Sequence, residues 1–210
     1  MIEIELKLEV ENFPNFKDYQ CVKEKHIVDV YYDTSDYKLI STGNFLRNRN
    51  NSKVDFKLNL GDLTHTFCNE TSFNYQGFKA NKSLSKIFNN LGIPYYDNFN
   101  NFDEFLMVNN LSKLAIIDKN RKEYKIDDLI VSLDDARDIG KFIEIEMDLP
   151  DGTEFDKSKI TSYMIGKLTS KNLLGRYKKV NSGYVELYLK RHNIEAYNLG
   201  LFKDWFKAYL

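Results

Sequence analysis

Alternating charged side chains in the first ten residues, MIEIELKLEV, are the first candidates for chemistry in this sequence. Glu3, Glu5, Lys7 and Glu9 alternate with aliphatic residues, which is the pattern of a β-strand with one apolar and one ionised face. A solvated strand on the surface of an antiparallel sheet would show the same alternation. Other strands must therefore show whether the charged face recurs and which residue types it uses.

The same two-faced pattern recurs in most of the later strand-like segments. The charged faces of these segments hold Arg47 and Arg49; Asp55 and Lys57; Lys119, Arg121 and Glu123; Asp134; and Glu144 and Glu146. Within each segment these residues are in phase, so they share one face of the strand. Asp134 is followed by a second acid, Asp135, which competes with it for the position, and Asp55 and Glu123 are candidates for orienting the cations.

Eight strands and several helices are predicted to position these side chains. The predicted strands cover 2–10, 26–33, 44–50, 53–60, 64–73, 114–125, 129–135 and 141–149. Helical periodicity appears at 81–91, 101–112 and 155–169, and residues 184–210 read as one or two helices. We therefore expect an α+β protein in which eight antiparallel strands close into a narrow barrel.

The predicted helices indicate which face of the sheet points inward. Amphipathic helices that pack outside the barrel need an apolar surface to cover, so the apolar faces of the strands must point outward. The charged faces then line a central tunnel. Desolvating an ion costs several kcal/mol, so such an interior is stable only if it is wet, if the charges pair, or if a charged ligand and a metal complete the set.

The cations of the predicted tunnel suit an anion with many oxygens. Arginine binds phosphate oxygens in pairs through its planar fork, and lysine acts as a point charge. The carboxylates would repel phosphate unless a divalent cation stood between them, and Mg²⁺ typically binds one or two carboxylates together with phosphate oxygens. The residues therefore predict polyphosphate binding with Mg²⁺ or Mn²⁺. The six cations are Lys7, Arg47, Arg49, Lys57, Lys119 and Arg121.

Composition narrows the class of protein. The 210 residues carry a net charge of −1 and include two cysteines, so we expect no nucleic-acid partner and a reducing compartment. The amino terminus lacks the apolar segment of a signal peptide, and no apolar run approaches a membrane span. We expect one cytoplasmic domain over residues 1–210, without a membrane partner; a homodimer stays open because no interface signal is visible.

Six short segments, taken in order, resemble the signature of the CYTH superfamily, the triphosphate tunnel metalloenzymes. EIELK at 3–7 resembles its ExExK motif, and FIEIE at 142–146 resembles its second ExE pair. The intervening elements are YYDT at 31–34, LRNR at 46–49, FKL at 56–58 and KNR at 119–121. Order and spacing fit from residue 1 to about 180. The resemblance implies an eight-stranded antiparallel tunnel that binds triphosphate compounds with a divalent metal.

The resemblance also implies roles for individual residues. It places the six cations on the phosphates and makes Glu5, Glu144 and Lys57 the expected catalytic residues. The expected metal ligands are Glu3, Glu5, Glu144, Glu146 and Asp134, of which Asp134 is also a candidate for positioning a cation. Glu70 falls where the family carries a glutamate, whereas Cys68 and Ser72 replace the basic and acidic residues that the family often has beside it.

The small-molecule substrate we expect is a triphosphate: inorganic triphosphate or a nucleoside or thiamine triphosphate. The expected reaction is metal-dependent hydrolysis of a phosphoanhydride. Two alternatives stay open, a class IV adenylyl cyclase that makes cyclic AMP from ATP and a binding module that turns nothing over. The sequence also leaves open which of Arg176, Lys178 and Lys179 faces the tunnel.

Overall fold

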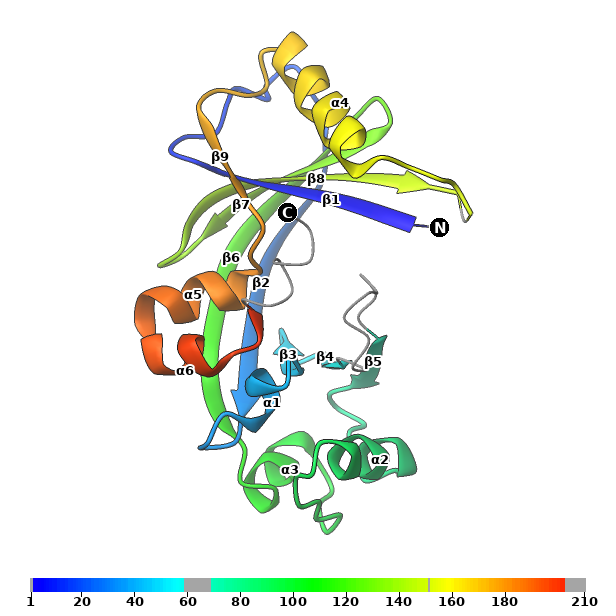
Figure 1. The fold of residues 1–210 in the computed structure, drawn as a ribbon, viewed down its shortest axis with the longest axis vertical. Helices are drawn as coiled ribbons and strands as arrows, with labels where there is room; N and C mark the ends of the chain where they lie inside the picture. Colours follow the sequence, from blue (N-terminus) through cyan, green and yellow to red (C-terminus); the bar gives the residue numbers. More distant parts are fainter. Residues whose placement is uncertain (1, 59–68, 151, 203–210) are drawn as a thin grey trace. The chain divides into compact units, whose positions relative to one another are not determined.

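The strands of this protein arise where apolar and polar residues alternate along the chain. The computed structural model describes residues 2–58, 69–150 and 152–202. The described helices are α1 (Lys38–Ser41), α2 (Lys82–Asn90), α3 (Phe102–Val108), α4 (Lys157–Ser170), α5 (Tyr184–His192) and α6 (Ile194–Leu199). The described strands are β1 (Ile2–Val10), β2 (Cys21–Asp33), β3 (Phe45–Arg49), β4 (Lys53–Leu58), β5 (Asn69–Asn74), β6 (Ser112–Ile126), β7 (Leu129–Ala136), β8 (Gly140–Leu149) and β9 (Tyr177–Val180) (Figure 1).

The strands form one sheet in the order β5-β4-β3-β2-β6-β7-β8-β1-β9. Each ladder with a determined register is antiparallel. The prediction of an antiparallel α+β fold is thus confirmed, but the sheet has nine strands instead of eight. Within the described residues no ladder joins β5 to β9, so the sheet is not closed there. The sequence missed β9 because its four residues, YKKV, show no apolar alternation.

Residue contacts divide the chain into two compact units, each made of two separate stretches. Unit 1 comprises Met1–Ile27 and Asp118–Asn181, and unit 2 comprises Val28–Ile117 and Ser182–Leu210. The strands β2 and β6 each contribute one part to each unit. The single domain expected over residues 1–210 stays a prediction. Among the described helices, none has the length and apolar character needed to cross a membrane.

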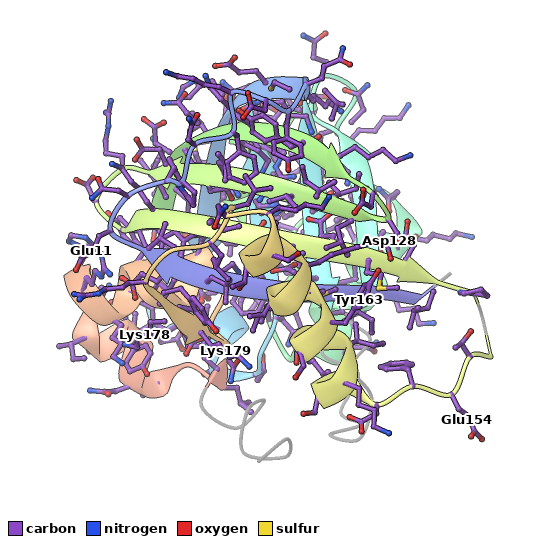
Figure 2. All side chains as sticks on the ribbon, turned by 90° about the horizontal axis from the view of Figure 1, so that it is seen from above. Glu11, Asp128, Glu154, Tyr163, Lys178 and Lys179 are labelled. Atoms are coloured by element: carbon purple, nitrogen blue, oxygen red, sulfur yellow. The ribbon has the colours of Figure 1, made fainter. Side chains whose placement is uncertain are left out.

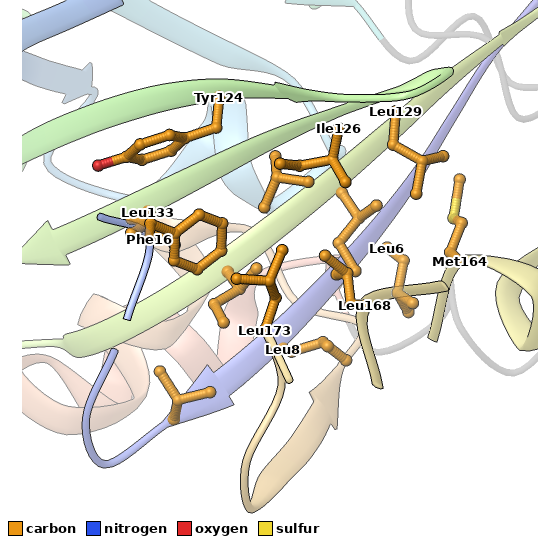
Figure 3. Packing of buried hydrophobic residues seen from close by; sticks show 14 of the residues in the cluster. Leu6, Leu8, Phe16, Tyr124, Ile126, Leu129, Leu133, Met164, Leu168 and Leu173 are labelled. Carbon is orange, nitrogen blue, oxygen red and sulfur yellow. The ribbon is translucent and has the colours of Figure 1, made fainter. Parts of the chain in front are cut away.

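The core of unit 1 lies on the apolar face of its strands. Leu6 and Leu8 of β1 pack in one buried cluster with residues of β6, β7 and β8, and Met164 and Leu168 of α4 belong to the same cluster (Figure 3). Because side chains alternate along a strand, covering this face with α4 leaves Glu5 and the other charged residues on the opposite face. The predicted packing of a helix against the apolar face is confirmed in unit 1.

Helix α4 is fixed at its start and at its middle. The side chain of Asp156 accepts hydrogen bonds from the backbone N–H groups of Ser158 and Lys159, at 2.9 and 3.2 Å, which is the usual N-cap arrangement. One turn further along, the Tyr163 hydroxyl donates to Asp128 in the β6–β7 turn at 2.9 Å (Figure 2). These contacts, together with the core, determine how α4 lies on the sheet.

The core of unit 2 is built in the same way but is rich in phenylalanine. Phe56 of β4 contacts Phe88 of α2 and Phe105 of α3, with ring centroids 6.2 and 6.4 Å apart. The other buried strand residues of this core are Tyr32, Leu46 and Val54. Asn81 and Asn101 cap the starts of α2 and α3. The helices again cover the apolar face, so the charged residues of β3 and β4 lie on the other face.

Several element bounds differ from those predicted. Strand β2 begins at Cys21 instead of residue 26, and α3 ends at Val108. The single turn α1 was not predicted, because four residues are too few to show helical periodicity. It is held by Asp33, whose carboxylate accepts hydrogen bonds from the backbone N–H groups of Leu39 and Ile40 at 2.8 and 3.0 Å. Parts of the strands predicted at 53–60 and 64–73 lie outside the described residues.

Candidate functional site

The register of unit 1 brings the predicted charged residues onto one face. Glu5 of β1 lies directly opposite Glu146 of β8, and Lys7 lies opposite Glu144. Arg121 of β6 lies opposite Asp134 of β7. Residues directly opposite in an antiparallel ladder share one face. The unit therefore gathers the following predicted site residues: Glu5, Lys7, Lys119, Arg121, Asp134, Glu144 and Glu146.

Asp134 is the most enclosed member of this group, with a side chain that is 0% exposed. Its Oδ1 accepts from Nε of Arg121 at 2.6 Å, and its Oδ2 accepts from Nζ of Lys119 at 2.6 Å and from Nη2 of Arg121 at 2.5 Å. Burial alone would raise the pKa of Asp134. The hydrogen bonds and charges of the two cations outweigh burial and lower this pKa. Both carboxylate oxygens are therefore used by cations.

Glu144 is also buried among cations. Nη2 of Arg121 donates to its Oε2, and Nζ of Lys7 lies 3.2 Å from its Oε1. Burial opposes ionisation of Glu144, but the charges of Lys7, Lys119 and Arg121 lower its pKa. Burial and the neighbouring carboxylates act in opposite directions on the pKa of each lysine, and the balance differs between Lys119 and Lys7. Burial lowers the pKa of Lys119, whereas for Lys7 the charges of Glu144 and Glu5 outweigh burial and raise the pKa.

Glu5 differs from the two buried carboxylates. Its side chain is 44% exposed, and Nζ of Lys7 lies 3.4 Å away. Desolvation by the surrounding protein and repulsion from Glu144 raise the pKa of Glu5. A raised pKa is expected for a carboxylate whose charge is only partly compensated. Glu5 lies opposite Glu146 in the β1–β8 ladder, so two carboxylates stand side by side on this face.

The carboxylate oxygens on this face suit a divalent metal ion whose remaining ligands are water and phosphate oxygens of a substrate. Among the side chains that the structure describes, no three or more His, Cys, Asp or Glu residues are arranged to hold a metal ion. Mg²⁺ usually takes one or two carboxylates and completes its shell with water and phosphate oxygens. The opposed Glu5 and Glu146 fit this arrangement. The side chain of Glu3, a further expected ligand, lies outside the described part.

Unit 2 carries a second charged face on β2, β3 and β4. Asp29 lies opposite Arg49 in the β2–β3 ladder, and Arg47 lies opposite Asp55 in the β3–β4 ladder. Arg49 binds Asp29 through two hydrogen bonds of 2.7 Å, from Nε and from Nη2. Lys57 is in phase with Asp55, so it lies on the same face. The predicted residues of unit 2 thus also come together.

A comparison with protein families matches most of the chain to one family. The model of the CYTH domain matches residues 1–172, which include all eleven predicted catalytic, substrate-binding and metal-binding residues. The chain belongs to the CYTH domain family. No curated protein matches this CYTH domain.

Solved structures resemble this CYTH domain in fold. HpAC1 from Hippeastrum, a candidate adenylyl cyclase described as revealing a dominant triphosphatase activity, is 16% identical with a TM-score of 0.60, covering 90% of this chain and 96% of that one. The PH1819 protein from Pyrococcus horikoshii OT3 is 18% identical with a TM-score of 0.54, covering 91% and 100%. A candidate adenylate cyclase from Bacillus halodurans is 16% identical with a TM-score of 0.53, covering 91% and 97%. At these identities the likeness concerns the fold alone.

The structure of this CYTH domain adds residues that sequence reasoning missed. Asp29, the bidentate partner of Arg49, was not among the candidates, although an acid flanked by two valines in the run IVDVYY was a usable signal. Tyr31 lies opposite Arg47 and is buried, which raises the pKa of its hydroxyl.

Other residues that the sequence singled out have separate outcomes. Glu123, a candidate for orienting a cation, accepts a hydrogen bond from Nζ of Lys25 at 2.9 Å. Cys68 and the side chain of Glu70 lie outside the described residues.

The sequence left open which of Arg176, Lys178 and Lys179, just after the CYTH match, faces the predicted tunnel. The register of β9 shows on which face two of these cations lie. Lys178 lies opposite Glu9 of β1, on the charged face, whereas Lys179 lies opposite Leu8, on the apolar face. Arg176 immediately precedes the strand. Lys178 is therefore the β9 cation that shares a face with Lys7.

Proposed function

We propose that this CYTH domain binds a triphosphate compound and hydrolyses its phosphoanhydride in the presence of Mg²⁺ or Mn²⁺. The observation that carries this proposal is the face of unit 1 on which Lys7, Lys119 and Arg121 are held by buried carboxylates. Cations already fixed in place can stabilise charge on a phosphoryl group without reorganising during the reaction. The neighbouring pair Glu5 and Glu146 supplies the hard oxygen donors that a divalent ion requires.

The proposed roles follow from these contacts. Lys7, Lys119 and Arg121 bind phosphate oxygens, and we propose the same for Arg47, Arg49 and Lys57 on the charged face of unit 2. Asp134 positions Lys119 and Arg121, because both of its oxygens are used by them. Glu144 aligns Lys7 and Arg121. Glu144 and Glu5 of unit 1 are the catalytic residues that we propose there, and Lys57 of unit 2 stays a predicted catalytic residue.

The proposed metal site consists of Glu5 and Glu146, with Glu3 as a further predicted ligand. Asp134 and Glu144 were also expected as ligands, but we assign them to the cations that their oxygens contact. When bound there, the ion would neutralise phosphate charge and polarise a phosphoryl oxygen. The pairing of Glu5 with Glu146 across the β1–β8 ladder supports this assignment, because it offers two carboxylates side by side. We further propose that the protein acts on a small-molecule triphosphate in the cytoplasm; a homodimer stays untested.

Among the solved structures of similar fold, HpAC1 is described as having a dominant triphosphatase activity and as a candidate adenylyl cyclase. Those words concern that protein, yet they make hydrolysis and cyclisation the two reactions to compare here. We favour hydrolysis because it requires only the cations and carboxylates that these faces carry, whereas cyclisation also requires a site for adenine and ribose.

The test is an assay of the whole chain with inorganic triphosphate, ATP and thiamine triphosphate, each with Mg²⁺ or Mn²⁺. We expect orthophosphate from at least one of these compounds and its loss when EDTA removes the metal. Cyclic AMP and pyrophosphate from ATP, without orthophosphate, would show a cyclase instead. Tight triphosphate binding with no product under either metal would show a binding module.

The two neighbouring lysines of β9 provide a matched test of the charged face. Lys178→Ala should raise KM for the triphosphate, since it removes a cation from the face that holds Lys7. For an exposed charge worth up to about 1 kcal/mol, the expected increase is about twofold to fivefold. Lys179→Ala, with the same charge change on the opposite face, should leave KM nearly unchanged. Equal KM values for the two variants, measured by orthophosphate release, would contradict the assignment.

A further inference from the structure

Asp55 of β4 connects the three strands β3, β4 and β5 on the charged face of unit 2. Its side chain is fully buried, and three side chains contact it. Nη2 of Arg47 donates to Oδ2 at 2.6 Å, Nζ of Lys53 lies 2.9 Å from Oδ1, and the Ser72 hydroxyl donates to Oδ1 at 2.8 Å. Both oxygens of Asp55 are therefore occupied by donors from different strands.

These donors keep Asp55 ionised. Burial opposes ionisation, but the hydrogen bonds from Arg47, Lys53 and Ser72 outweigh it and lower the pKa of Asp55 to about 2. At neutral pH the group is therefore a permanent anion inside the sheet face. A buried anion bonded directly to a guanidinium restricts that guanidinium to a narrow set of orientations.

The two arginines of β3 are held in different ways. Arg47 is 9% exposed, and its guanidinium contacts Asp55 at 2.6 Å through Nη2 and approaches Asp29 to 3.6 Å through Nη1. Arg49 is 36% exposed and binds Asp29 through both Nε and Nη2. Asp29 therefore binds mainly Arg49, through two hydrogen bonds. Asp55 is the carboxylate that hydrogen-bonds Arg47 and so sets its orientation.

We propose that Asp55 is a positioning residue that aligns Arg47 for the phosphate of the substrate, and that Ser72 holds the Asp55 carboxylate in place. This inference rests on the proposed function and deepens it. Arg47 would contact the phosphate, whereas Asp55 acts through Arg47. Misplacement of such a group by about 1 Å can slow a reaction about 10²-fold without weakening binding of the ground state.

The consequence is a split between the two kinetic constants. Asp55→Asn keeps the shape of the side chain but removes a negative charge, so Arg47 loses its alignment while the face becomes more positive. We expect kcat for triphosphate hydrolysis to fall about 10- to 100-fold, with KM unchanged or lower. Asp55→Glu, which restores the charge, should recover part of kcat. Asp36→Asn is the matched control, because Asp36 is an exposed acid of the same unit, and both constants should stay near wild type.

A second measurement does not depend on turnover. In ¹⁵N NMR spectra, a guanidinium fixed by Asp55 rotates slowly and gives separate Nη resonances, which Arg47→Lys assigns by their loss. We expect these resonances to merge in Asp55→Asn and to persist in Asp36→Asn. If wild type neither hydrolyses nor binds inorganic triphosphate, the proposed function fails, while the Arg47 resonances still test the alignment by Asp55.

Three results would overturn the inference. Folded Asp55→Asn with the kcat and KM of wild type would show that Asp55 has only a structural role, as would unchanged Arg47 resonances in that variant. If Asp55→Asn does not fold, Ser72→Ala replaces it, since that variant keeps the charge and loses one hydrogen bond. Ser72→Ala should lower kcat about threefold, in the range of one lost hydrogen bond, and broaden the Arg47 resonances; no change in either would equally contradict the proposal.

Discussion

Asp134→Asn should lower the free energy of unfolding by about 3–5 kcal/mol, the range for removing one partner of a buried ion pair. The expected loss is large because Asp134 is 0% exposed and neutralises Lys119 and Arg121 at 2.5–2.6 Å. An asparagine of the same size removes the negative charge that both cations contact directly, and leaves Glu144 as their nearby anion. Urea unfolding, followed by circular dichroism at neutral pH, measures the effect.

Asp135→Asn is the control for this variant. Asp135 is the next residue of β7, is exposed and lies on the other face, so its replacement should change stability by no more than about 0.5 kcal/mol. The pH dependence provides a second check. The folded pKa of Asp134 is lowered, so its stabilisation is present above the unfolded pKa and is lost as the pH falls through the folded value. The free energy of unfolding of Asp134→Asn should therefore fall less steeply with decreasing pH than that of wild type. Equal pH slopes for the two proteins would contradict the role of the Asp134 charge. Equal stability losses in Asp134→Asn and Asp135→Asn would contradict it as well.

Arg121→Lys should reduce kcat for triphosphate hydrolysis about 10²-fold, comparable to the loss of one donor that stabilises a transition state. Lysine keeps the positive charge but has no planar fork. It therefore cannot make the two hydrogen bonds to Asp134 and the bond to Glu144 at the same time. Orthophosphate release at saturating triphosphate measures the change.

Lys122→Gln is the matched control for Arg121→Lys. Lys122 is the next residue of β6, is half exposed and pairs with the exposed Glu24 at 3.4 Å, so kcat should not change. Because Arg121 also stabilises unit 1, the kcat values are compared at a temperature where urea unfolding shows both variants to be folded. A wild-type kcat in Arg121→Lys would show that position 121 contributes only its charge.

The alternation of side chains predicted the faces of the sheet correctly in both units. Leu6 and Leu8 are buried beneath α4, while Glu5 and Lys7 lie on the charged face, as the pattern of the first ten residues predicted. The same holds for Phe56 against Asp55 in unit 2. The order and spacing of the six motif segments along the chain also predicted the family.

What the sequence by itself determined is therefore the set of residues on each face, since side chains alternate with a period of exactly two along every strand. Only the tertiary structure decided which of them are partners. It selected Asp134 over Asp135, joined Asp29 to Arg49 across 20 residues of sequence, and placed Lys178 instead of Lys179 on the charged face. The physical reason is that pairing depends on the register between strands far apart in the chain, and this register is set by long-range packing and turn geometry that no single strand encodes.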